Sequence, residues 1–208
     1  MNRYLIKMRY FFCCCVIGLL FLCGYCDTAM SHPHVFVTQR VGVHFDDKGL
    51  AGFKIRWEFD EMFSSMIIGD YDKNRNMHLE PEEVATIKKE AFSNLSNHNY
   101  FTFVRIDGDP FIVQFIKHFT AEIHQGKLVY RFLVPCHVAA RTTYRHIVVA
   151  TYDPTYYTSV SFANDEPAML SNVDAFDVKS TIKRDMSISI YYDMINPWAL
   201  FLDFRRQR

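Results

Sequence analysis

The chain has 208 residues, 16% of them aromatic, and equal numbers of basic and acidic side chains, 23 Lys+Arg and 23 Asp+Glu. A net charge near zero argues against nucleic acid or an anionic membrane surface as a partner, because such partners select basic proteins. The abundance of aromatic and β-branched residues favours strands.

The first 31 residues have the pattern of a secretory signal. Three basic residues precede an apolar run over residues 10–25, and Ala29-Met30-Ser31 places small residues at the −3 and −1 positions of a cleavage site. We therefore expect residues 1–31 to be removed and the exported, periplasmic protein to begin at His32. A retained membrane or lipid anchor is the alternative, although the run is short for a bilayer span of roughly 20 residues.

Five of the six cysteines lie in this segment, so the mature protein would keep Cys136 alone and could form no internal disulfide. The roughly 177 residues that follow are enough to bury a core without cross-links. His137 cannot easily activate Cys136, because neighbours in an extended chain point to opposite faces. No other catalytic motif is present, and we expect no enzyme activity.

In the first half of the mature chain, a segment of alternating apolar and polar residues is followed by segments of helical periodicity. Residues 35–45 have a period of two, which predicts a strand, and residues 50–59 return as the second strand of a hairpin. A short helix is expected over 60–69, then a polar loop, then a helix from Pro81 to about Asn97.

The second half is predicted to be β-rich. Strands are expected at 101–106, 111–124, 127–134, 146–152, 158–162 and 186–192, with a loop at 164–172 and a last apolar segment at 198–204. The expected class is α+β: a mainly antiparallel sheet or sandwich with an EF-hand-like helix–loop–helix insert at about 60–98. Residues 32–208 would form one domain, with about 100–208 as a candidate C-terminal β subdomain.

The loop between the two helices has the ligand spacing of a calcium site. Oxygen donors occupy positions 1, 3, 5, 7, 9 and 12 of a twelve-residue loop: Asp72, Asn74, Asn76, His78 (through its backbone carbonyl), Glu80 and Glu83. Position 6 is Met77 where such loops require Gly, because the chain turns there with a left-handed backbone. The alternative is a loop that kept its shape and lost its ion.

His32-Pro33-His34 is a candidate transition-metal site. If cleavage leaves His32 first, its free amine and its imidazole can chelate one ion, and His34 can add a third nitrogen. Pro33 excludes a geometry built on deprotonated backbone amides, because proline has no N–H. The alternative is two idle histidines on an unstructured terminus.

Several segments occur in an order that resembles a known family. Ser-His-Pro-His-Val-Phe-Val stands at residues 31–37, Arg-Trp-Glu-Phe-Asp-Glu at 56–61 and Ala-Thr-Tyr-Asp-Pro-Thr-Tyr-Tyr at 150–157, with the 72–83 loop between them. In these segments the chain resembles the bacterial exported family called "domain of unknown function one thousand and seven", over nearly the whole mature chain.

The resemblance implies a periplasmic, non-enzymatic accessory protein of a nickel-, cobalt- or zinc-type transport system, working with an inner-membrane metal transporter. The ion would be Zn, Ni, Co or Cu, and the residues to test are His32, His34, Asp60, Glu61 and Asp153. Asp60 also fits a helix N-cap and Asp153-Pro154 a turn. The rival function is a β-rich partner-binding scaffold whose EF-hand-like loop is structural or binds calcium weakly.

Overall fold

A long hairpin of strands β1 (Val35–Asp46) and β2 (Gly49–Phe59) begins the part of the chain that the computed structural model describes, residues 32–207. Odd-numbered residues of β1 are buried and even-numbered ones face outward, which confirms the period-two prediction. The Asp46 carboxylate accepts the N–H groups of Lys48 and Gly49 and closes the predicted turn. The predicted signal segment lies outside the described residues.

Sheet A is built around this hairpin. Its order is β5-β6-β2-β1-β8, and β9 also pairs with β1. The added strands are β5 (Lys117–His124), β6 (Lys127–Ala139), β8 (Thr158–Phe162) and β9 (Ala168–Ser171). β8 and β9 run parallel to β1, whereas every other pair in the sheet is antiparallel. The sheet is therefore mainly but not wholly antiparallel.

Sheet B has the order β10-β11-β7-β3-β4 and is antiparallel throughout its described strands. Its strands are β3 (Thr102–Ile106), β4 (Asp109–Phe111), β7 (Arg145–Thr151), β10 (Phe176–Arg184) and β11 (Trp198–Arg206). Residues 100–207 thus contribute to both sheets and do not form a separate β subdomain.

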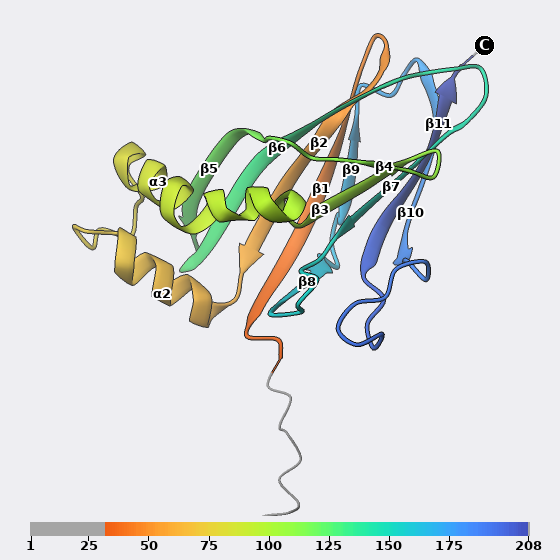
Figure 1. The fold of residues 1–208 in the computed structure, drawn as a ribbon. Helices are drawn as coiled ribbons and strands as arrows, with labels where there is room; N and C mark the ends of the chain where they lie inside the picture. Colours follow the sequence, from red (N-terminus) through yellow and green to blue (C-terminus); the bar gives the residue numbers. More distant parts are fainter. Residues whose placement is uncertain (1–31, 208) are drawn as a thin grey trace, which may run out of the picture. The chain divides into compact units, whose positions relative to one another are not determined.

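The helical insert leaves sheet A after β2 and returns to sheet B. It contains α2 (Glu61–Tyr71), α3 (Pro81–Ile87), the π-helical turn η1 (Lys88–Phe92) and the 3-10 segment η2 (Ser93–Phe101). Figure 1 shows α2 and α3 beside β5 and β6, with β10 and β11 on the opposite side of the long hairpin. Pro81 occupies the first turn of α3, where its missing N–H is harmless.

The inner face of sheet A is covered by two partners. Toward the end of β1, the Phe45 ring lies 5.1 Å from that of Phe176 and 5.2 Å from that of Phe204, both in sheet B. Toward the end of β2, the Trp57 ring lies 6.3 Å from that of Phe92 in η1. All five rings belong to one buried cluster. Sheet B and the helical insert therefore share one hydrophobic core.

The strand predictions differ from the structure in four places. Residues 164–172 contain β9, and β10 was not predicted although Phe176, Val178 and Ile182 alternate with polar residues. Residues 186–192 alternate in sequence yet form no strand, because Tyr191 and Tyr192 have φ of 52° and 56°, which extended chains do not allow. The predicted strand 111–124 is split, and residues 112–116 carry the chain from sheet B to sheet A.

Cys136 is expected to be inert in the folded protein. Its side chain is buried on the inner face of β6, and burial raises the pKa of its thiol to about 12. Since the thiolate is the reactive form, a thiol reagent at pH 8 should label the native protein far more slowly than the urea-unfolded protein. Fast labelling of the native state, followed by mass spectrometry, would contradict this prediction.

Within residues 32–207, no helix is both long enough and apolar enough to cross a lipid bilayer.

Candidate functional site: the terminal histidines and the loop at 72–83

The two terminal histidines rest on the folded domain. Their ring centroids are 5.1 Å apart, and the Tyr157 ring lies 4.9 Å from that of His34 and 5.9 Å from that of His32. The Tyr191 ring also contacts that of His32, with centroids 5.6 Å apart. The N–H groups of His34 and Val35 both donate to the carbonyl of Tyr157, at 2.9 and 3.2 Å. The predicted alternative of an unstructured terminus is therefore wrong for these residues.

Asp153 organises the turn that presents Tyr157. Its carboxylate accepts the backbone N–H and the hydroxyl of Thr155 at 2.8 and 2.7 Å, and the N–H of Thr158 at 3.1 Å. The side chain is buried, with 5% exposure. Asp153 thus holds the tyrosine that the histidines contact, and the turn interpretation of Asp153-Pro154 is confirmed.

Asp60 is placed to connect β1 with α2. One carboxylate oxygen accepts the N–H of Phe63 at 2.9 Å, which makes Asp60 the N-cap of α2. The other accepts the N–H of Phe36 at 2.7 Å. Glu61 is exposed in the first turn of α2, where its charge suits the helix dipole.

Of the five predicted metal-site residues, only His32 and His34 lie together as a possible ligand pair. His32 and His34 are brought together, whereas the oxygens of Asp60 and Asp153 are occupied by backbone and hydroxyl donors. Between residues 32 and 207, no three His, Cys, Asp or Glu side chains converge as a metal site would require. A third ligand for the histidine pair would have to be another kind of group.

We expect Asp153→Ala to lower the free energy of unfolding by about 3 kcal/mol, because three hydrogen bonds to a buried carboxylate are lost. Denaturant unfolding in the presence of a chelator measures this. Asp174→Ala, at an exposed loop aspartate, is the control and should change stability by less than about 0.5 kcal/mol. A loss that appeared only with metal present would show that Asp153 is a ligand instead.

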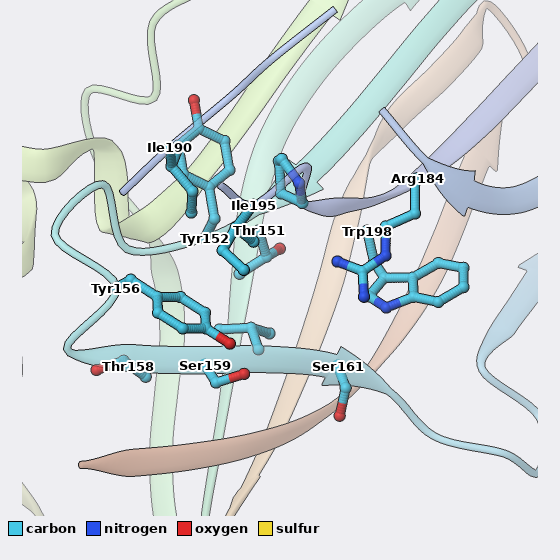
Figure 2. A pocket seen from close by; sticks show the side chains of 12 residues that line it. Thr151, Tyr152, Tyr156, Thr158, Ser159, Ser161, Arg184, Ile190, Ile195 and Trp198 are labelled. Atoms are coloured by element: carbon cyan, nitrogen blue, oxygen red, sulfur yellow. The ribbon is translucent and has the colours of Figure 1, made fainter. Parts of the chain in front are cut away.

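A cavity of about 150 Å³ is lined by polar and apolar side chains, among them Thr158, the residue that follows Tyr157. Tyr156 lines it, and the Tyr156 ring lies 5.4 Å from that of Tyr191. Figure 2 shows Tyr156 at one side and Arg184 with Trp198 at the other. The Arg184 guanidinium lies 4.8 Å from the Trp198 ring centre, a cation–π contact. Sequence reasoning missed this cavity because its lining comes from five separate segments.

The hydroxyl of Thr151 is a hydrogen-bonding group of this cavity that has no partner in the described structure. Its side chain lines the cavity and is 1% exposed, and its hydroxyl is buried without a hydrogen-bond partner. Buried hydroxyls are normally paired with protein or ordered water. The volume is enough for several water molecules at about 30 Å³ each.

In the loop 72–83, Asp72 is buried and shapes the turn. Its two carboxylate oxygens accept the N–H groups of Asn76, at 3.2 Å, and of Met77, at 2.9 Å. Met77 has φ of 61°, so the left-handed backbone predicted at position 6 is confirmed. For a residue with a Cβ this conformation costs on the order of 1–2 kcal/mol.

The other predicted calcium ligands lie inside the same loop. Glu83 accepts the N–H of Lys73 at 2.8 Å and that of Glu80 at 3.1 Å, which ties the two ends of the loop together. The side-chain carbonyls of Asn74 and Asn76 accept backbone N–H groups, the latter from His78 at 2.7 Å. The loop is therefore closed by its own hydrogen bonds.

Among the acidic residues of this loop, Glu80 has the most strongly shifted pKa. The carboxyl of Glu83 and the side-chain amides of Asn76 and Asn74 lower the pKa of Glu80 to about 2. One Glu80 oxygen accepts both amides, at 2.7 and 3.2 Å, whereas the other is buried without a hydrogen-bond partner. Glu80 is thus a carboxylate at neutral pH with one oxygen unsatisfied.

Comparison with known proteins gives a family but no activity. The "Uncharacterized 15.5 kDa protein in trpE 3'region" of Spirochaeta aurantia is 29% identical over 138 residues, which cover 65% of this chain and 96% of that protein. An "Uncharacterized protein" of Haemophilus influenzae is 25% identical over 138 residues, 65% of each chain. The family model "Protein of unknown function (DUF1007)" matches residues 17–187. The chain therefore belongs to the DUF1007 family.

Proposed function

We propose that the protein is a periplasmic, non-enzymatic accessory component of a metal transport system, which holds a transition-metal ion at His32 and His34. One observation carries the proposal: the two imidazoles lie 5.1 Å apart, centroid to centroid, and are held there by contacts with Tyr157. A pair fixed in this way loses less conformational entropy on binding an ion than two histidines on a loose end.

The chemistry of the site selects the class of ion. Imidazole nitrogens bind Zn, Cu, Co and Ni better than they bind Mg or Ca. Cleavage after Ser31 would add the α-amine of His32, so that the amine and imidazole of one residue close a chelate ring. His32 is exposed, so an ion held there would remain at the surface, where a transporter could receive it.

The test uses the protein with His32 as its first residue and the same protein with one glycine added before it. Calorimetric titration with Zn²⁺, Ni²⁺, Co²⁺ and Cu²⁺ should show one site in the first form. The added glycine should weaken binding on the order of 10²-fold, because the chelate ring loses its effective concentration. His34→Gln should also weaken binding, and His124→Gln, at an exposed histidine at the end of β5, should not.

Equal affinities of the two forms would show that the amine is not a ligand. Unchanged binding by His34→Gln would show that the second imidazole is not a ligand. No binding by either form would leave the partner-binding scaffold as the better function. Mass spectrometry of the exported protein tests the requirement that the mature chain begins at His32.

Calcium binding by the 72–83 loop is a second candidate function. It is favoured by the unpaired, buried oxygen of Glu80, since such an oxygen is normally satisfied by a hydrogen bond or a cation. Calcium prefers six to eight oxygens, and this loop carries the required donor types at the required positions. Binding would require the amides of Asn74 and Asn76 to turn their carbonyls from the backbone to the ion.

Calorimetry with millimolar Ca²⁺ tests this candidate, with an expected dissociation constant of about 10⁻⁴–10⁻³ M. Glu83→Gln should abolish the signal, because position 12 supplies two oxygens. Glu82→Gln is the matched control, since Glu82 is the neighbouring exposed acid and has no place in the ligand spacing. Absence of both heat and a thermal shift in the parent would leave the loop purely structural.

A further inference from the structure

Three arginines stand side by side on the outer face of sheet A. Arg40 of β1 is directly opposite Arg56 of β2, and Arg56 is directly opposite Arg131 of β6. The burial patterns of all three strands turn these side chains away from the core. Like charges directly opposite one another destabilise a sheet. A row of three therefore suggests a role other than folding.

The surface beside this row is hollowed. A cavity of about 490 Å³ is lined by the three arginines together with Gly42, Lys54, His118, Leu133 and Met169. Gly42 is directly opposite Lys54, and a Cβ at Gly42 would lie 3.3 Å from the Cβ of Lys54. Glycine within a strand is typical of a place where a ligand approaches the backbone closely. The volume lies in the usual range for small-molecule sites.

Each arginine of the row pairs with a carboxylate that does not line the cavity. Arg40 donates to both oxygens of Asp165, at 2.7 and 2.8 Å. Arg56 pairs with Glu58 at 3.0 Å, and Arg131 pairs with Glu122 at 2.6 Å. Lys54 also lines the cavity, and none of the lining residues is acidic. The cavity is therefore electropositive.

The central arginine has hydrogen-bonding capacity left over. Nη2 of Arg56 donates to Glu58, whereas Nη1 is buried without a hydrogen-bond partner. A desolvated guanidinium nitrogen without an acceptor is unfavourable. An oxyanion between Arg40 and Arg131 would provide the missing acceptor through a charge-assisted hydrogen bond.

We propose that this cavity binds a small organic anion, with its oxyanion group at Arg56 and its apolar body along Leu133 and Met169. Ligands of this class have a carboxylate or phosphate group attached to a hydrocarbon. This site is separate from the terminal histidines, and neither requires the other.

Asp165 competes with the ligand for Arg40. It lies in the loop between β8 and β9, and its side chain is 79% exposed. The hydrogen bond from Arg40 holds the pKa of Asp165 below its usual value, so the carboxylate is charged at neutral pH. An exposed ion pair of this kind is weak. Entry of the anion would therefore displace Asp165 from Arg40.

The experiment titrates the mature protein with four probes: octanoate, octyl phosphate, inorganic phosphate and octan-1-ol. We expect one saturable site for octanoate or octyl phosphate, and the tighter of the two identifies the oxyanion. Arg56→Gln should weaken that binding tenfold or more, because a charge-assisted hydrogen bond is lost. Asp165→Asn should strengthen it roughly twofold to fivefold, because the competing carboxylate is removed.

Lys89→Gln is the control, since Lys89 is an exposed basic residue of the helical insert, in η1, and does not line this cavity. Arg131→Gln repeats the test if Arg56→Gln fails to fold, as judged by thermal unfolding. Unchanged binding in both arginine variants, equal binding of octan-1-ol, or no binding of any probe would overturn the proposal.

Discussion

Phe92→Ala should lower the free energy of unfolding by about 3–5 kcal/mol, the largest loss expected from any single truncation in the insert. Phe92 is 1% exposed, and its ring contacts Trp57 and Phe132 of sheet A at centroid distances of 6.3 and 5.2 Å. It also contacts Phe119 at 4.5 Å. Removing the ring would leave a cavity where the helical insert meets the sheet.

Chemical denaturation followed by tryptophan fluorescence measures this loss, because Trp57 lies at the contact. Phe115→Ala is the matched control: Phe115 is 52% exposed, so its truncation should change stability by less than about 0.5 kcal/mol. Similar losses in the two variants would mean that the insert does not depend on Phe92 for its anchorage.

Asp185→Ala should also lower the free energy of unfolding by about 3–5 kcal/mol, because it leaves the charge of Arg105 without its partner. The two groups are 2.6 Å apart, and the side chain of Asp185 is only 3% exposed. Ser187 donates its N–H and its hydroxyl to the other carboxylate oxygen, at 3.1 and 2.6 Å. This cluster connects β3 with the loop that follows β10.

The double variant Arg105→Met, Asp185→Ala is the control, because it removes both charges. It should lose less stability than Asp185→Ala alone, since no unpaired charge remains beside the core. If the double variant lost the sum of both single losses, the two residues would not be coupled.

Asp185 should also make stability fall in acid. Burial alone would raise its pKa, but the hydrogen bonds from Ser187 and Arg105 outweigh burial and hold the pKa of Asp185 below its ordinary value. A carboxyl whose pKa is lower in the folded than in the unfolded state stabilises the fold above the unfolded pKa of about 3.9. This contribution is lost as the pH falls through the folded pKa.

Thermal unfolding of the parent and of Asp185→Asn at several pH values between 7 and 3 tests this. The stability difference between them should be constant above about pH 5 and should shrink below pH 4. Asp46, Asp165 and Asp177 also have lowered pKa values, so both proteins will lose some stability in acid. A difference independent of pH would contradict the role of Asp185.

Local features of the fold were predictable from sequence. The period of two in β1, the turn at Asp46, the helix–loop–helix and the left-handed backbone at Met77 all depend on residues close together in the chain. The N-cap role of Asp60 was predictable as an alternative for the same reason. Such features follow from backbone sterics and hydrogen bonds between near neighbours.

Pairing across the chain was not predictable. The alternation at residues 186–192 suggested a strand, yet the chain turns there, while β8 and β9 join β1 in parallel from more than a hundred residues away. Strands pair where their apolar faces can be buried together, and these partners cannot be identified from a single sequence.

The sequence by itself therefore determined the candidate residues, and the tertiary structure decided how they are used. His32 and His34 were visible as a motif, but their support by Tyr157 depends on a turn held by Asp153. Arg40, Arg56 and Arg131 were unremarkable in sequence, and only the register of three strands places them in one row. The physical reason is that a side chain's neighbours are set by long-range packing, whereas its chemistry is set by its identity.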